Sequence, residues 1–493
     1  MKLLHHIPEW NASPPEVWKH WQLAQLRDYL NRRVVPFSTH YSRVFREHGI
    51  HPLDIKSFDD WSHVPFTSKK DLGNPRDFVL MPNEAVLRRE PGMIFDALLH
   101  GRNAAKEHAE AEFRPILLTS TTGRSAEPVP FLYTKHDLHN LDISGTRLML
   151  AGRSQREFRH MNLFPYAPHL AFWLAHHAGL GFGTFMLSTG GGKTLGTDGN
   201  IKLIDKIQPD ILIGMPTFIY HIMREANESG KRWTNLKRIV LGGEKLAAGL
   251  RARLRDLAAA LGSSNVHIMA TYGFTEAKMA FPECVGESHD SHGYHLSPDL
   301  GFIEIIDPKT GQLVPDGHPG EIVFTPLDSR GTVVLRYRTG DIAEGGLTWE
   351  KCPNCGRTCP RLLGPISRVS EVRELHFDKL KGTLVNFNML EHLLDDQRGI
   401  AAWQIELRKH HNDPLETDEV HLHLSAEPGV REDDPELAVT RRFYEATEIR
   451  PNELHFHTLA EMREQLGVGR LLKEEKLVDH RPKSNALQPA LSS

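Results

Sequence analysis

Three apolar segments decide the fold: Ile211-Leu-Ile-Gly-Met-Pro-Thr-Phe-Ile219, Arg238-Ile-Val-Leu-Gly-Gly243 and Val266-His-Ile-Met-Ala-Thr-Tyr-Gly273. A segment with helical periodicity follows each of the first two, YHIMREA after the first and EKLAAGLRARLRDLAAALG after the second. Short apolar strands that alternate with helices at this spacing indicate a mostly parallel sheet covered by helices. Residues 160–275 therefore predict an α/β core.

The flanking segments predict structure of other kinds. Residues 1–110 have apolar positions three and four apart, which is typical of helices. After Gly301, the strands FIEIID, GEIVFTPL and TVVLRYRTGD are separated by Pro-Lys-Thr-Gly and Pro-Asp-Gly turns, which predicts a small β-rich subdomain, antiparallel or barrel-like. From about residue 368, helices and strands predict a separate α+β domain. We expect an N-terminal domain at 1–367 and a smaller, mobile C-terminal domain at 368–493 with a disordered tail.

The composition excludes several classes of protein. The 493 residues are 40% hydrophobic and 25% charged, which excludes collagen-like, coiled-coil and wholly disordered chains. The formal charge is −4, from 59 basic and 63 acidic residues with no basic block, so we expect no nucleic-acid partner. Four cysteines cannot form a disulfide framework and no signal-peptide pattern is present, which favours a soluble cytoplasmic protein.

One stretch, His169–Leu187, is apolar enough to be weighed as a membrane span. It contains three His and three Gly, which favour a buried helix–turn–strand over a span. We therefore expect no membrane partner.

Three motifs carry chemistry that suits a nucleotide. The hydroxyls of Thr119, Ser120, Thr121 and Thr122, followed by Gly123, can donate to a phosphate chain, although an ordinary Ser/Thr turn has the same pattern. The segment Ala270–Glu276 ends an apolar strand. In it Gly273 permits close approach of a ligand, Tyr272 offers a face for stacking, and Glu276 supplies a hard oxygen for Mg²⁺.

The third motif is Tyr337-Arg338-Thr339-Gly340-Asp341. A carboxylate just after a Thr-Gly turn is well placed to accept both hydroxyls of a ribose. Each motif alone is compatible with an ordinary turn, but the three in this order are much more specific. They resemble the phosphate loop, the adenine/magnesium motif and the ribose-binding aspartate of the acyl-adenylate-forming enzymes.

The resemblance is strongest to the phenylacetate–CoA ligase branch of that superfamily. The segments YSRVFREHGIHPLDIKSFDDWSHVPFTSKKDL, PDILIGMPTFI, RIVLGGEKL and CPNCGRT resemble that branch, and the similarity runs from about Tyr41 to the segment 473–481. It implies a two-step reaction: a carboxylic acid attacks the α-phosphate of ATP with Mg²⁺, and a thiol then displaces AMP.

The resemblance also implies roles for particular residues. Lys473, in KEEKLVDHR, is similar to the branch's catalytic lysine, and Thr275 and Glu276 are implied to be catalytic, with Glu276 holding Mg²⁺. Attack on the α-phosphate needs such a cation because two anions are brought together. Further nucleotide or cofactor contacts are implied for Gly243, Glu244, Thr271 and Arg368, the last of these at the interdomain hinge.

The sequence departs from the family pattern at two places. Ser120 occupies a position where the phosphate loop usually has Gly, which restricts the backbone and puts nucleotide handling in doubt. At the hinge, Arg368 is followed by Val-Ser-Glu instead of the usual x-Asp-Asp, and the matching Gly382 comes several residues late.

The cysteines predict a metal site. Cys352, Cys355 and Cys359 lie within eight residues, and Cys-x-x-Cys supplies two of the four ligands that a structural Zn²⁺ needs. Cys284 and His295 lie in segments that resemble those near the branch's metal site. The fourth ligand is either His295 or Cys359.

The acid-binding residues follow from the resemblance. The family lines its acyl pocket with the segments that correspond here to NLFPYAPH and LGGE, so Phe164, Tyr166, His169 and Gly243 are candidates, with Ala270 near the carboxylate. Aromatic and small residues suit a planar aryl acid.

We therefore predict an ATP- and Mg-dependent acid–thiol ligase that uses coenzyme A, with a small carboxylic acid, aryl or arylacetic, as substrate. A rival is a free-standing adenylating enzyme that loads the phosphopantetheine of a carrier protein. A rival of another class is an inactive zinc-containing homologue that only binds nucleotide.

Overall fold

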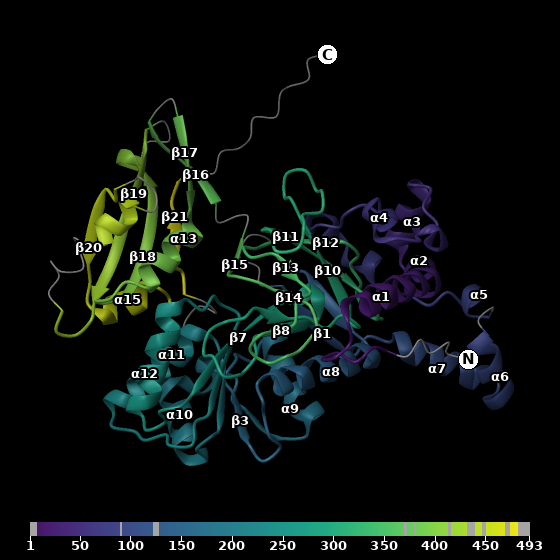
Figure 1. The fold of residues 1–493 in the computed structure, drawn as a ribbon, viewed down its shortest axis with the longest axis horizontal. Coiled ribbons are helices and arrows are strands. Elements are labelled where there is room, and N and C mark those ends of the chain that lie inside the picture. The colour runs from purple at the N-terminus through teal and green to yellow at the C-terminus, as the bar shows by residue number, and fades with distance from the viewer. Residues whose placement is uncertain are drawn as a thin grey trace. The chain divides into compact units, whose positions relative to one another are not determined.

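The computed structural model describes residues 7–88, 91–121, 128–368, 372–378, 381–412, 416–430, 439–445, 450–468 and 474–481 (Figure 1). The chain divides into two compact units. The first comprises Met1–Lys245 and Leu254–Ser367, and the second comprises Leu246–Arg253 and Arg368–Ser493. The C-terminal segment predicted to be disordered lies, from residue 482 on, outside the described residues.

The N-terminal region of the first unit is helical, as the periodicity predicts. Its elements are α1 (Pro15–Tyr29), the π-helix η1 (Leu30–Val34), α2 (Val35–Phe37), α3 (Thr39–Glu47), α4 (Phe58–Ser62), α5 (Glu84–Leu87), α6 (Pro91–His100) and α7 (Arg102–Phe113), with short 3-10 turns η2 (Pro52–Asp54), η3 (Lys69–Gly73) and η4 (Pro75–Phe78). Buried aromatic residues such as Trp18, Tyr41, Phe45 and Trp61 fill the core beneath these helices.

A six-stranded sheet forms the centre of the first unit, in the order β4-β3-β5-β6-β7-β8. All neighbouring strands run parallel except β7 and β8, which are antiparallel. Its strands are β3 (Arg159–Asn162), β4 (Phe185–Ser188), β5 (Ile211–Gly214), β6 (Arg238–Gly242), β7 (His267–Phe274) and β8 (Met279–Pro282). Helices along this part of the chain are α8 (Lys135–Ala151), α9 (Leu170–Phe182), α10 (Gly192–Ile207), α11 (Pro216–Glu228) and α12 (Ala248–Ala260). The α/β core predicted for residues 160–275 is therefore confirmed.

Smaller antiparallel sheets complete the first unit. A hairpin joins β1 (Leu117–Ser120) to β2 (Pro130–Tyr133), and a second sheet has the order β10-β11-β12-β15. The bounds are β10 (Gly301–Ile306), β11 (Gly320–Pro326), β12 (Tyr337–Ala343) and β15 (Ile366–Arg368), with a third sheet of β13 (Leu347–Thr348), β14 (Arg361–Leu362) and β9 (Tyr294–His295). The predicted β-rich subdomain is present, as open sheets.

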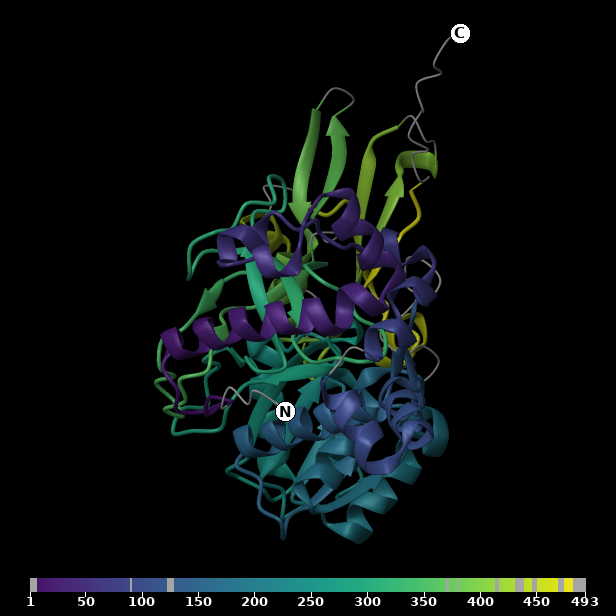
Figure 2. The same ribbon diagram turned by 90° about the vertical axis from the view of Figure 1, so that its right-hand side faces the viewer.

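Helix α1 lies across this antiparallel region (Figures 1 and 2). The side-chain amides of Gln22 and Gln25 donate to the carbonyls of Pro298 at 2.8 Å and Leu327 at 3.2 Å. These bonds join residues nearly 300 positions apart, so the N-terminal helices are an integral part of the first unit.

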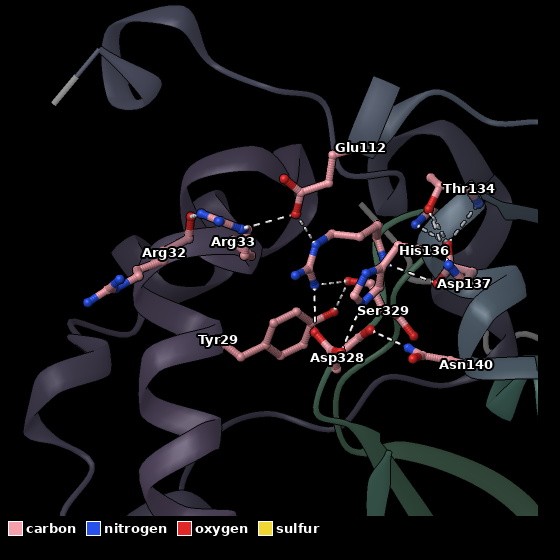
Figure 3. Close-up of polar contacts among 12 residues, drawn as sticks. Tyr29, Arg32, Arg33, Glu112, Thr134, His136, Asp137, Asn140, Asp328 and Ser329 are labelled. Carbon is pink, nitrogen blue, oxygen red and sulfur yellow. Dashed lines mark hydrogen bonds and ion pairs between the residues drawn. The ribbon is translucent and has the colours of Figure 1, made fainter. Parts of the chain in front are cut away.

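A polar network around Arg330 holds the N-terminal helices to the connection between β11 and β12 (Figure 3). The Arg330 guanidinium donates to Glu112 Oε1 at 2.6 Å and to Asp328 Oδ1 at 3.0 Å. The Tyr29 hydroxyl donates to the Ser329 carbonyl at 2.7 Å. The hydrogen bonds of Arg330 to these carboxylates are charge-assisted and therefore strong. Together with the Tyr29 bond, they fix the position of α1 and α7 against the sheet.

Helix α8 begins at the same network. Thr134 is its N-cap and forms a capping box with Asp137. Asp137 also accepts from the backbone N–H groups of Arg330 and Gly331, at 3.0 and 2.7 Å. Its ion pair with Lys278, at 3.2 Å, is buried on both sides. One carboxylate therefore joins α8, the β11–β12 connection and the segment between β7 and β8.

The second unit is an α+β fold. Its main sheet has the order β20-β19-β18-β21, with an antiparallel central pair and parallel outer pairs. The elements are β16 (Val372–Asp378), β17 (Lys381–Asn386), α13 (Phe387–Asp395), β18 (Ile400–Lys409), η7 (His410–Asn412), β19 (Asp418–Ala426), β20 (Glu453–Phe456), α15 (Leu459–Gln465) and β21 (Leu477–Asp479). The core of this unit lies between one face of the sheet and α13.

The apolar stretch His169–Leu187 is a helix, a turn and a strand, as predicted. Helix α9 ends at Gly183, whose φ of 74° forms the left-handed C-cap, and β4 follows. Among the described residues, no helix has the length and apolar character needed to cross a membrane.

Candidate active site

The end of β7 carries the predicted adenine/magnesium motif, and Asp341 lies in β12, where the register with β11 is interrupted. The Tyr272 hydroxyl donates to Asp341 Oδ2 at 2.8 Å, although the two residues are 69 positions apart. Thr271, which directly precedes Tyr272, donates its hydroxyl to the Leu241 carbonyl at 3.0 Å. The structure therefore brings the residue predicted for stacking and the residue predicted for ribose binding into direct contact.

Hydrogen bonds of Thr339 fix the backbone at Asp341. Its N–H donates to Thr339 Oγ1 at 3.0 Å, and the Thr339 hydroxyl donates to the Ile322 carbonyl at 2.8 Å. Gly340 has a φ of 73°, a conformation that costs glycine little. The Thr-Gly sequence thus serves to aim the carboxylate, and only 7% of Asp341 is exposed.

Glu276 lies in the 3-10 turn η5 (Thr275–Ala277) that follows β7. Its Oε1 accepts from the Tyr337 hydroxyl at 2.7 Å, so the ribose-motif segment also holds the residue predicted to bind Mg²⁺. Sequence analysis did not single out Tyr337. The signal was available, because Tyr337 is the first residue of the motif that contains Asp341.

The phosphate-loop residues Thr119, Ser120 and Thr121 are buried at the end of β1. The Ser120 carbonyl lies 3.5 Å from Thr275 Oγ1 and 3.2 Å from His169 Nδ1. Thr121 pairs with Val129 at the base of the loop. Thr122 and Gly123 lie outside the described residues.

Ser120 is the last residue of β1 and has extended backbone. Any L-residue adopts that conformation, so the position does not require glycine. Its N–H donates to the Pro168 carbonyl at 2.5 Å. The serine side chain therefore does not force the backbone into an unfavourable conformation at this position, contrary to the expectation from the sequence.

Gly243 and Glu244 follow β6, next to the end of β7. Gly243 has a φ of 80°. A side chain at Gly242 would come within 2.5 Å of Thr271 Oγ1 and 3.5 Å of the Phe164 ring. Glu244 Oε2 accepts from the Thr217 hydroxyl at 2.7 Å and from its N–H at 3.2 Å. Glu244 thus holds the first turn of α11 as well as bordering the candidate site.

A second cluster, of three cysteines and one histidine, contains side chains that commonly bind metal ions. One ligand atom from each of Cys284, His295, Cys352 and Cys355 lies within 4.8 Å of all the others. The Cys284 and Cys352 sulfurs are 3.8 Å apart, and Cys355 Sγ is 3.3 Å from His295 Nε2. Zinc–sulfur bonds of about 2.3 Å in a tetrahedron place two sulfurs about 3.8 Å apart.

The surrounding groups orient these ligands. His295 Nδ1 lies 3.2 Å from the Pro282 carbonyl, which can only accept, so Nε2 is left with a lone pair toward the cysteines. Hydrogen bonds from Cys284 and Cys352 lower the pKa of the Cys355 thiol, which favours the thiolate that a metal needs.

Cys359 does not join the cluster, although it is only four residues from Cys355. It is fully buried, and burial raises the pKa of its thiol to about 12. Of the two residues predicted as the fourth ligand, the structure therefore favours His295 over Cys359. Strand pairing explains the outcome, because β9 pairs with β14 and brings His295 opposite Arg361, beside the cysteine turn.

The chain is similar to several known proteins. A family model described as AMP-binding enzyme matches residues 161–326. A phenylacetate-coenzyme A ligase of Thermus thermophilus is 29% identical over 367 residues, which cover 73% of this chain and 72% of that protein. One of Pseudomonas putida is 26% identical over 397 residues, which cover 78% and 77%. These similarities support the resemblance of the chain to the acyl-adenylate-forming enzymes of the phenylacetate–CoA ligase-like branch.

Solved structures share the fold of this chain. The crystal structure of 2-hydroxyisobutyryl-CoA ligase in the postadenylation state superposes with a TM-score of 0.75 at 18% identity, over 96% of this chain and 91% of that one. The same protein in its thioesterification state, with CoA, gives a TM-score of 0.62. The α/β fold class predicted from the sequence is confirmed.

The residues predicted for the acyl pocket differ in their burial and contacts. Phe164 is buried beside the Gly242–Gly243 turn, whereas Tyr166 is 67% exposed and packs edge-on to Phe172, with ring centroids 5.2 Å apart. The Ala270 N–H donates to Glu283 Oε2 at 2.7 Å, so the strand end is fixed by a buried carboxylate that sequence analysis did not select.

The two remaining predicted residues belong to the second unit. Arg368 is exposed at the end of β15. Lys473 lies outside the described residues.

Proposed function

We propose that this chain activates an aryl or arylacetic acid with ATP and Mg²⁺, forming an acyl-adenylate, and then transfers the acyl group to coenzyme A. The observation that carries the proposal is the 2.8 Å hydrogen bond between Tyr272 and Asp341. It supports a single nucleotide site formed by two motifs that are far apart in the sequence.

Asp341 would accept the two ribose hydroxyls. Its two carboxylate oxygens offer about four acceptor positions, and a ribose needs two acceptors for its two hydroxyls. The hydrogen bond between Tyr272 and Asp341 fixes the Tyr272 ring, which is pre-oriented to stack on a base. Pre-orientation lowers the entropy lost when the nucleotide binds.

Glu276 would hold Mg²⁺ beside the phosphates. The Tyr337 hydroxyl occupies its Oε1, which holds the side chain in one orientation. The ion would neutralise charge on the phosphate oxygens when bound. The Thr275 hydroxyl lies 3.5 Å from the Ser120 carbonyl of the phosphate loop, and it would donate to the α-phosphate when ATP binds.

The aryl preference rests on the residues near the end of β6. Phe164 gives an aromatic wall, and Gly243 and Ala270 leave room for a flat ring. Planar aromatic groups pack well against aromatic and small side chains.

The cysteine cluster would hold a structural zinc ion. Four protein ligands leave no open position for substrate, so the ion would cross-link the connections around β8, β9 and β14. Free cysteines and a thiolate metal site also suit a reducing compartment, and we propose a cytoplasmic location on that ground.

Acid-dependent exchange of pyrophosphate with ATP tests the first half-reaction, over a panel of benzoic, phenylacetic and fatty acids. Exchange with aryl acids is the expected result. Exchange with none of these acids would support the inactive, nucleotide-binding rival.

Thioester formation tests the second half-reaction, with coenzyme A and a phosphopantetheinylated carrier protein supplied in parallel. Turnover with coenzyme A is expected. Turnover with the carrier protein alone would favour the free-standing adenylating enzyme instead.

A further inference from the structure

A group of histidines outside the catalytic machinery lies on one face of the main sheet of the second unit. His421 and His423 are on β19, and Glu453 and His455 are on β20, with His457 just beyond it. The register pairs His421 with Glu453 and His423 with His455. Because side chains alternate along a strand, all five point to the same face, opposite the apolar core that contains Leu422 and Leu424.

Three ligand atoms in this group form a nearly equilateral triangle. His421 Nδ1 is 3.2 Å from His455 Nε2 and 3.5 Å from Glu453 Oε2, and His455 Nε2 is 3.3 Å from the same oxygen. Bonds of about 2.0–2.1 Å from a tetrahedral zinc ion place two nitrogen or oxygen ligands about 3.3–3.4 Å apart. The three atoms therefore form one face of such a tetrahedron.

A neighbouring carboxylate orients the first of these ligands. His421 Nε2 lies 3.2 Å from Glu419 Oε2. The carboxylate can only accept, so the ring proton resides on Nε2 and a lone pair on Nδ1 faces His455 and Glu453. A carboxylate that fixes the tautomer of a histidine in this way is typical of metal sites.

The group is accessible from one side. His421 is 1% exposed at the base, whereas the Glu453 side chain is 57% exposed and that of His455 is 35% exposed. A cation can therefore reach the triangle from solvent, and the fourth position can be taken by water.

The adjacent pair of histidines has a different geometry. His423 Nδ1 and His457 Nε2 are 2.9 Å apart, which is an ordinary hydrogen-bond distance and short for two ligands of one ion. Glu406 contacts Nε2 of His423, as Glu419 contacts Nε2 of His421, so the short distance between the two imidazoles is what distinguishes this pair. This pair is explained without a metal.

We propose that His421, Glu453 and His455 bind a divalent transition-metal ion of the zinc class, which ties the short edge strand β20 to β19. Two imidazoles with one carboxylate favour such an ion over Mg²⁺ or Ca²⁺, which take oxygen ligands. The site is separate from the cysteine cluster, which lies in the first unit.

Zinc titration of the full-length chain, with the cysteine site already filled, tests the proposal. The wild type should bind one further equivalent of Zn²⁺, and Mg²⁺ at the same concentration should not compete. Glu453→Gln and His455→Gln should lose that equivalent. Glu453 is a surface residue, so its variant should fold normally. Glu419→Gln, which neutralises the orienting carboxylate and also changes its contacts with Arg408 and His410, should weaken binding about 10- to 100-fold.

His457→Gln is the matched control, since it changes a histidine two positions from His455 and should leave zinc binding intact. Amide exchange in β20 provides a second readout: added zinc should slow it in the wild type and in His457→Gln, but not in His455→Gln. Equal zinc binding by the wild type and Glu453→Gln would overturn the proposal. So would a loss in His457→Gln as large as that in His455→Gln.

Discussion

At the scale of single residues, Asp341 makes the sharpest prediction. Asp341→Ala removes both proposed ribose bonds, and hydrogen bonds to a charged acceptor contribute about 1.5–3 kcal/mol each. ATP affinity should fall at least about tenfold, because 1.4 kcal/mol corresponds to a factor of ten. Calorimetric titration with ATP measures the effect.

Tyr272→Phe is the matched control for this substitution. It removes only the hydroxyl that holds Asp341 and retains the ring and the carboxylate. Its loss of ATP affinity should be clearly smaller. Unchanged affinity in Asp341→Ala would show that the ribose binds elsewhere.

The cysteines give a second prediction at this scale. Purified protein should contain about one tightly bound zinc ion in the cysteine site, and Cys355→Ser should lose it together with thermal stability, because metal binding contributes to folding. Cys359→Ser removes a buried thiol of the same sequence segment that lies outside the cluster, and should retain the ion. Elemental analysis measures the zinc content of each variant, and the midpoint of thermal unfolding measures its stability. Zinc retained by Cys355→Ser and lost by Cys359→Ser would reverse the assignment.

At the scale of elements, the first residue of β7 links stability to pH. His267 is stacked on His289, with ring centroids 4.2 Å apart. Burial, with smaller contributions from Arg238 and His289, lowers the pKa of His267 from 6.5 to about 4. Between these two values the unfolded chain binds a proton at His267 and the folded chain does not. This residue should therefore destabilise the fold as the pH falls from 6.5 toward 4, and have no effect above that range.

His267→Gln should consequently lose less stability than the wild type between pH 7 and pH 5. Thermal midpoints at the two pH values give the comparison. The same substitution at His318, which is exposed in a loop, controls for the general effect of replacing a histidine by glutamine. An identical slope in His267→Gln would contradict the predicted protonation.

The elements were largely predictable because local signals specify them. Apolar runs followed by amphipathic segments predict β5, α11, β6 and α12, and the Thr-x-x-Asp pattern at Thr134 predicts the start of α8. These signals act over a few residues, where propensity and capping dominate.

Contacts between distant segments were less predictable. Sequence spacing favoured neither His295 nor Cys359 as the fourth ligand. The pairing of β9 with β14 brings His295 to the cysteines. The bond between Tyr337 and Glu276 joins residues 61 positions apart, and the histidine group on β19 and β20 depends on a register across 34 residues. No local pattern specifies such a register.

At the scale of the whole molecule, the residues of the proposed reaction are divided between the two units. Asp341, Tyr272 and Glu276 belong to the first unit, and Lys473 falls in the second. The family resemblance implies that the C-terminal domain changes position between the two half-reactions. A residue supplied by that domain can therefore act in one half-reaction and be absent from the other.

The neighbouring lysine, Lys476, has a structural role and is not an alternative to Lys473. Its Nζ lies 2.7 Å from Asp395 Oδ1 and 4.5 Å from the centre of the Trp403 ring. Although burial opposes its charge, the Asp395 carboxylate raises the pKa of Lys476. Substitution of Lys476 should lower the stability of the second unit, whereas substitution of Lys473 should leave it intact.

Lys473→Ala should lose acid-dependent pyrophosphate exchange by orders of magnitude. Its charge would offset repulsion between the substrate carboxylate and the α-phosphate, an interaction that is strongest in the transition state. Given a chemically prepared acyl-adenylate, the same variant should still form the thioester at close to the wild-type rate, because the lysine is not needed in that step. Lys473→Arg, which keeps the charge, should retain part of the exchange activity. An equal loss in both half-reactions would show that Lys473 acts through the stability of its domain and not through adenylation.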